Sequence, residues 1–101
     1  MMHPTFDHDG YPTEETLQAI RGWEADMHAL FAFIGEAWRY PDYWHREGDT
    51  YRFSTGGWSG NESLIEALEA NFVAWAICWL SSARGGHYVF SVPMTRKAKE
   101  G

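Results

Sequence analysis

Cysteine and lysine are almost missing from this chain. Its 101 residues include one cysteine, Cys78, and no lysine before Lys97. A single cysteine cannot form a disulfide within the chain, which excludes a small domain stapled by disulfides. Cys78 also lies within an apolar run. We therefore expect a buried thiol in a reducing compartment and not a catalytic thiolate.

Long apolar runs are missing as well. No segment approaches the ~18–20 apolar residues that a membrane-spanning helix requires. The first residues contain no apolar stretch of the kind found in a secretory signal, so we expect no signal peptide. The sequence thus predicts a cytoplasmic protein that has no membrane partner.

Positive charge is scarce throughout the body of the chain. From Met1 to Val92 there are 13 Asp and Glu residues against 5 Arg, and the other cations are Arg96, Lys97 and Lys99. Nucleic-acid binding requires cations facing the phosphates, so we expect no direct contact with DNA or RNA. An acidic surface favours solubility or a protein partner with a basic surface.

Aromatic residues, in contrast, are abundant: six Trp, five Tyr and six Phe. The apolar residues between Trp23 and Trp38 follow a helical period, which predicts a helix with one buried face that ends before Pro41. Thr13 is placed to cap an earlier helix that ends at Gly22. Ser59 and Glu62 fit a capping box, with Ser59 as N-cap of a further helix.

Two β-hairpins are expected. The first runs from about Tyr43 to Thr55 and turns at Glu47-Gly48-Asp49, with Tyr51 and Phe53 on one face. The second joins a strand beginning near Ala74 to a strand over 87–92, across Ala83-Arg84-Gly85-Gly86. The apolar run 73–80 also fits an extension of the preceding helix.

These elements predict one α+β domain over residues 13–93, with an antiparallel sheet of about four strands in two hairpins and two to three helices packed on it. Residues 1–12 are predicted to form an irregular arm. Residues 94–101 are predicted to form a flexible basic tail.

Two glycine-rich loops, over 54–62 and 81–87, are the candidate ligand site. Glycine pairs let backbone approach a ligand closely. If both loops lie at one end of the sheet, Trp58, Asn61, Arg84 and His87 would line one cleft that suits an anionic ligand. The alternative is that the glycines only form turns. The glycine spacing matches neither a Walker loop nor a dinucleotide fingerprint.

Catalytic, metal and cofactor motifs are not evident. No nucleophile and base occur at a recognised spacing, and His3, Asp7, His8 and Asp9 lack a compact ligand pattern. We expect no catalytic residues, no metal and no cofactor. Tyr40, Tyr43 and Trp44 form an aromatic cluster that suits an interface with a protein partner or a second copy of the chain.

Three stretches carry a resemblance: Tyr11-Pro12-Thr13-Glu14-Glu15 with Trp23, the loop 54–62, and residues 81–88. In these the chain resembles a group of small acidic proteins encoded by phages and prophages, for which no activity is assigned. The resemblance implies a viral accessory protein in the bacterial cytoplasm. Together with the acidic body and the lack of a catalytic triad, it predicts a non-catalytic protein that binds a host or viral macromolecule, such as a component of a defence system. The alternative is a small anion-binding module or hydrolase-like enzyme built on the two glycine loops.

Overall fold

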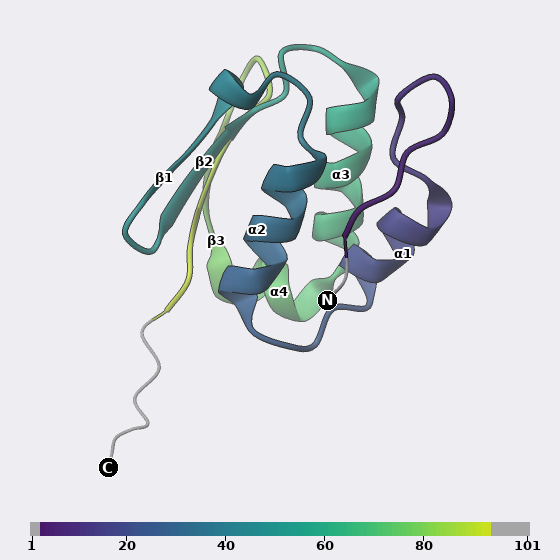
Figure 1. The fold of residues 1–101 in the computed structure, drawn as a ribbon. Coiled ribbons are helices and arrows are strands. Elements are labelled where there is room, and N and C mark those ends of the chain that lie inside the picture. Colours follow the sequence, from purple (N-terminus) through teal and green to yellow (C-terminus); the bar gives the residue numbers. More distant parts are fainter. Residues whose placement is uncertain (1–2, 94–101) are drawn as a thin grey trace.

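The fold is that of an α+β protein. A computed structural model of the chain describes residues 3–93, which form one four-stranded antiparallel sheet and four α-helices (Figure 1). The predicted fold class is therefore confirmed. The predicted basic tail, 94–101, lies outside the described residues, as do residues 1 and 2.

The first two helices begin at side-chain caps. Helix α1 (Glu14–Arg21) starts where the Thr13 hydroxyl accepts the Thr16 N–H, as predicted, and its C-cap is Gly22. Helix α2 (Met27–Ala37) starts at Asp26, whose carboxylate accepts the His28 N–H. The helix predicted to start near Trp23 therefore begins about one turn later, at Met27, because Asp26 is its N-cap.

Residues 3–12 contain no α-helix or strand, yet they are tied to α1. The Thr5 N–H donates to Oγ1 of Thr16 over 2.8 Å, and Phe6 forms an isolated bridge with Pro12. The Asp7 carboxylate accepts the N–H groups of Asp9 and Tyr11, which closes a turn between the two ends of this bridge.

The first hairpin follows a 3₁₀ turn over Pro41–Tyr43. Strands β1 (Trp44–Glu47) and β2 (Thr50–Ser54) pair antiparallel around a turn in which Gly48 has φ +63°. Tyr51 and Phe53 are buried, whereas Arg52 is exposed. The predicted hairpin and the predicted inward face of β2 are both confirmed.

The segment from Ser59 to Ala83 differs from the prediction in two ways. Helix α3 (Ser59–Ala70) is followed directly by helix α4 (Phe72–Cys78), and strand β3 (Trp79–Ala83) begins only afterwards. The strand predicted from Ala74 is therefore wrong over 74–78. The cause is Asn71, whose side-chain oxygen accepts the Ala74 N–H and starts a new helix.

The predicted capping box at Ser59 is also wrong. Trp58 occupies the N-cap position of α3, and no side chain hydrogen-bonds this cap. Ser59 lies inside the first turn, where its hydroxyl donates to the Tyr11 hydroxyl over 3.1 Å. The Ser59 hydroxyl, which the capping-box pattern predicts to cap α3, thus binds Tyr11 of the N-terminal segment instead.

Strand β4 (His87–Ser91) completes the sheet, in the order β1-β2-β4-β3. Helices α2 and α3 lie on one side of the sheet, and α1 packs against α3 (Figure 1). Phe31 of α2 joins the layers, with its ring centroid 4.9 Å from that of Tyr51 and 5.2 Å from that of Phe90. Among the described residues, no helix covers the opposite face of the sheet.

Candidate functional site

The two glycine loops meet at one end of the sheet. The Thr55 N–H donates to the Gly86 carbonyl over 3.0 Å, and a hydrogen bond of 2.8 Å joins Oγ of Ser54 to Nδ1 of His87. Gly86 has φ +80°, and a Cβ there would contact the Thr55 side chain. Only glycine fits this position, so the close approach of the loops depends on it.

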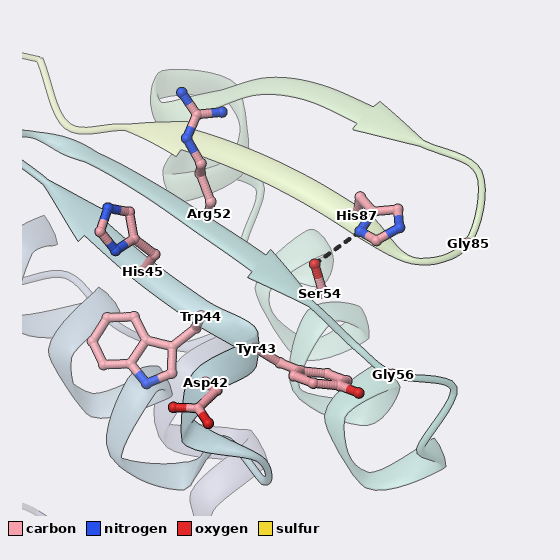
Figure 2. A pocket seen from close by; sticks show the side chains of 9 residues that line it. All are labelled: Asp42, Tyr43, Trp44, His45, Arg52, Ser54, Gly56, Gly85 and His87. Atoms are coloured by element: carbon pink, nitrogen blue, oxygen red, sulfur yellow. Dashed lines mark hydrogen bonds between the residues drawn. The ribbon is translucent and has the colours of Figure 1, made fainter.

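A pocket of about 440 Å³ lies beside the meeting point, on the face of the sheet that the helices leave open (Figure 2). The alternation of β2 explains its polar floor: with Tyr51 and Phe53 turned into the core, Arg52 and Ser54 project to the other face. The lining comes from β1, β2, β4 and the adjoining loops: Asp42, Tyr43, Trp44, His45, Arg52, Ser54, Gly56, Gly85 and His87.

The register brings the polar side chains together in two cross-strand pairs. His45 lies opposite Arg52 across β1 and β2, and Ser54 lies opposite His87 across β2 and β4. Cross-strand neighbours on one face have Cβ atoms about 4.5–5.5 Å apart. Figure 2 shows the four side chains spread along the open face, with the Ser54–His87 hydrogen bond at the loop end.

Of the four residues predicted to line a cleft, only His87 lines this pocket. Trp58 instead stacks beneath the Arg39 guanidinium, 4.7 Å from the ring centroid, and against Tyr11. Arg84 is exposed in the hairpin turn and does not reach the lining. The two loops therefore meet, as the hypothesis required, but three of the four predicted side chains do not enter the pocket.

Asn61 has a different role from the one expected. It is fully buried, and its amide holds two neighbouring segments. Its oxygen accepts the Arg39 N–H over 2.9 Å, and its nitrogen donates to the carbonyls of Arg39 and Thr55. The side chain is occupied by backbone groups, so it positions the loops and is not free for a ligand.

The aromatic cluster expected at an interface is divided. Tyr40 and Tyr43 are both exposed, with ring centroids 5.4 Å apart. Trp44 points the other way, packing its indole on Phe53 at 5.4 Å and beside Gly35 of α2. Tyr43 and Trp44 thus both line the pocket, but only Tyr43 is exposed, and the half-buried indole of Trp44 packs against the core.

A second surface was not anticipated from the sequence. Five large apolar side chains of α4 and β3 are exposed, from 42 to 79% of their area: Phe72, Val73, Ile77, Trp79 and Leu80. We call them the α4–β3 surface. Strand β3 is an edge of the sheet, and each of its five residues is exposed. The available signal is a run without any charged residue from Ala70 to Ala83, part of which, from about Ala74, predicts a strand.

A separate polar cluster lies at the turn of the first hairpin. Nδ1 of His28 lies 2.7 Å from the Tyr51 hydroxyl, and Nε2 of the same ring lies 3.1 Å from a carboxylate oxygen of Asp49. Burial raises the pKa of Tyr51, so its hydroxyl keeps its proton near neutral pH. None of the three residues lines the pocket, and the cluster fixes α2 to the turn between β1 and β2.

Two further observations bear on chemistry. Within residues 3–93, no three His, Cys, Asp or Glu side chains are grouped as a metal ion would require. Cys78 is fully buried, and this burial raises the pKa of its thiol. A buried, protonated thiol is a poor nucleophile.

Comparison with protein-family models, with curated proteins and with solved structures finds no match to this chain. In the part of the chain that the structure describes, no helix has the length and apolar character needed to cross a membrane.

Proposed function

We propose that this chain is a non-catalytic binding protein of the phage accessory type, and that it binds a protein of its bacterial host through the α4–β3 surface. The observation that carries the proposal is the exposure of this surface: Phe72 is 79% exposed and Leu80 56%. Large exposed apolar side chains gathered on neighbouring elements of a small soluble protein mark an interaction site.

The extent of the surface fits a protein partner. An aromatic side chain has ~150–250 Å² of surface and an aliphatic one somewhat less, so each of the five exposes on the order of 100 Å². Their sum, on the order of 500 Å², approaches the ~800 Å² that each partner of a standard interface buries. A groove of about 430 Å³ adjoins the start of α4 and offers room for an anchoring side chain; apolar side chains line it together with Arg21 and Glu24.

The two edges of the sheet suggest how the partner binds. The β1 edge carries His45, Arg46 and Glu47, and charges of this kind discourage pairing with another strand. The β3 edge, Trp79-Leu80-Ser81-Ser82-Ala83, carries no charge. We infer that the partner adds an antiparallel strand beside β3 and covers α4 with apolar side chains of its own.

The charge of the chain favours a different protein over a second copy. Each copy has a formal net charge of −6, so two copies would repel outside the uncharged contact. A host protein with a basic rim around an apolar strand would gain attraction at the same place. The resemblance to phage accessory proteins supports a host component as the partner.

The test compares two double variants with matched charge changes. Ile77→Glu with Leu80→Glu places two carboxylates on the α4–β3 surface, whereas Gln18→Glu with Ala29→Glu places them on exposed positions of α1 and α2. All four positions are exposed, so both variants should fold, which circular dichroism verifies. Each is used to retain proteins from a bacterial lysate at low salt, and the retained partner is then purified and titrated.

We expect the wild type and the Gln18/Ala29 variant to bind the purified partner equally, and the Ile77/Leu80 variant to bind at least tenfold more weakly. Equal binding by both variants would refute this surface as the site. Retention of no protein, together with a monomer by light scattering, would refute protein binding altogether. A dimer that the Ile77/Leu80 variant dissociates, with no other protein retained, would replace the host partner with a second copy.

A further inference from the structure

We propose that the pocket on the open face of the sheet binds a phosphorylated small molecule with a planar ring, such as a nucleoside monophosphate. This site is separate from the α4–β3 surface: it is lined by β1, β2 and β4, and none of its lining residues belongs to α4 or β3. The inference is therefore independent of the proposed protein partner.

The cationic side of the pocket is the first argument. Within residues 3–93, no ion pair or hydrogen bond engages the guanidinium of Arg52. By contrast, Arg21 pairs with Glu14, and Arg46 donates to the Gly48 carbonyl over 2.7 Å. A guanidinium that is unpaired, and that faces a pocket in an acidic protein, is a ready partner for an anion.

The neighbours of Arg52 extend this argument. The imidazole of His45 stands beside it on β1, and the Ser54 hydroxyl and the His87 imidazole complete the polar face (Figure 2). These groups offer a guanidinium, two imidazoles and a hydroxyl around one space. A tetrahedral phosphate accepts hydrogen bonds in several directions and can use more of these donors than a planar carboxylate can.

The rest of the pocket lining indicates which organic group would accompany the phosphate. A volume of about 440 Å³ is more than a bare phosphate fills and lies in the range of small-molecule sites. The exposed ring of Tyr43 offers an aromatic surface, and the backbone of Gly56 approaches it so closely that a Cβ there would lie 2.7 Å from Cε2 of the ring. Asp42, another lining residue, offers an acceptor for an amino or hydroxyl group of the organic part.

We infer binding and not hydrolysis. The Ser54–His87 hydrogen bond joins direct cross-strand neighbours, which is the expected behaviour of two polar side chains at such positions. In the described part of the chain, no carboxylate lies within ion-pair distance of His87 to orient its ring as a general base. The pair can donate hydrogen bonds to a phosphate without further chemistry.

The test uses adenosine 5′-monophosphate, adenosine and inorganic phosphate as probes in nuclear magnetic resonance titrations of the isotopically labelled protein. The decisive variant is Arg52→Gln, and its control is Arg84→Gln, because each removes one exposed arginine and only Arg52 lines the pocket. The observed signals are the backbone amides of β1, β2 and β4.

We expect the monophosphate to shift the amides of His45, Arg52 and His87 and to bind at least tenfold more tightly than either adenosine or phosphate alone. Arg52→Gln should weaken this binding at least tenfold, and Arg84→Gln less than twofold. The proposal is overturned if the monophosphate shifts no amide near the pocket, if both variants lose equal affinity, or if phosphate alone binds as tightly as the nucleotide.

Discussion

Gly35 of α2 lies directly beneath the indole of Trp44. A Cβ on Gly35 would stand 2.6 Å from Cη2 of that ring, closer than two carbons approach without displacement. The same indole stacks on Phe53 with ring planes 7° apart. This contact lets the first hairpin lie close to α2, so it sets the position of the strands that carry the pocket.

Gly35→Ala should therefore destabilise the protein. In an exposed helix position the same change stabilises by about 0.5–1 kcal/mol, but forcing a methyl group into a filled contact costs about 1–3 kcal/mol. We expect a net loss, seen as a lower midpoint in urea unfolding. The control is Trp44→Leu, which removes the ring: in that background Gly35→Ala should be neutral or stabilising. Additive effects of the two changes would refute the contact.

The first hairpin could be predicted from the sequence because its signals are local: glycine in the turn and alternating apolar residues in β2. The boundary between α4 and β3 could not be predicted from the sequence. An apolar run of seven or eight residues fits a strand or a helix equally well. Asn71 decides between them, and its amide donates to the carbonyls of Ile20 and Trp23, about fifty residues earlier in the chain.

Asn71→Ala should cost stability for that reason. The change removes the cap of α4 and leaves two largely buried carbonyls without their donor. A lost cap costs about 1 kcal/mol, and each unsatisfied buried group about 1–3 kcal/mol, so we expect at least ~2 kcal/mol in chemical unfolding. The exposed neighbour Glu69→Ala is the control and should change stability by less than about 0.5 kcal/mol. Equal effects would remove the assigned role of Asn71.

The site was harder to predict than the fold. Both glycine loops could be located from the sequence. However, the predicted ligand residues came mostly from the loops, and the strand residues that line the pocket were missed. Arg52 and His45 carry no motif, and they come together only because β1 and β2 pair in one register. Asn61 shows the reverse error, since a polar residue in a glycine loop looks available until its backbone partners are known.

Asn61→Ala distinguishes a structural role of Asn61 from a role in ligand binding. If Asn61 joins the segments at Arg39 and Thr55, its loss should lower stability by at least ~2 kcal/mol, because three hydrogen bonds of a fully buried side chain disappear. Thermal unfolding measures this, with Glu62→Ala as the exposed neighbour for comparison. An unchanged melting temperature, with weaker nucleotide binding, would restore Asn61 as a ligand residue.

Stability should fall at alkaline pH. Burial raises the pKa of both Cys78 and Tyr51 above their ordinary values of 9.0 and 10.0. The unfolded chain therefore loses these protons at a lower pH than the folded chain does. The unfolded state then binds fewer protons, and the free energy of unfolding decreases as pH rises above about 9. Below that pH the contribution is fully present.

Tyr51→Phe isolates one part of this effect. It removes the hydroxyl bound to His28, which should cost about 1 kcal/mol at pH 8. It should also flatten the decline in stability between pH 10 and 11, because the titrating group is gone. Urea unfolding at several pH values measures both, with the exposed Tyr40→Phe as control. Parallel declines in wild type and Tyr51→Phe would contradict the assignment.

Binding of a single nucleotide does not imply binding of a nucleic acid. A duplex presents one phosphate per ~1.7 Å and requires a row of cations, whereas this face offers Arg52 beside two imidazoles and the body of the chain carries 13 acidic residues against 5 Arg. We expect no shift of a duplex in gel electrophoresis at about 0.15 M salt, even at protein concentrations that saturate the monophosphate site. A shift that persists after deletion of residues 94–101 would show that the folded body itself binds DNA. That outcome would refute the expectation that the acidic charge of the body prevents nucleic-acid binding.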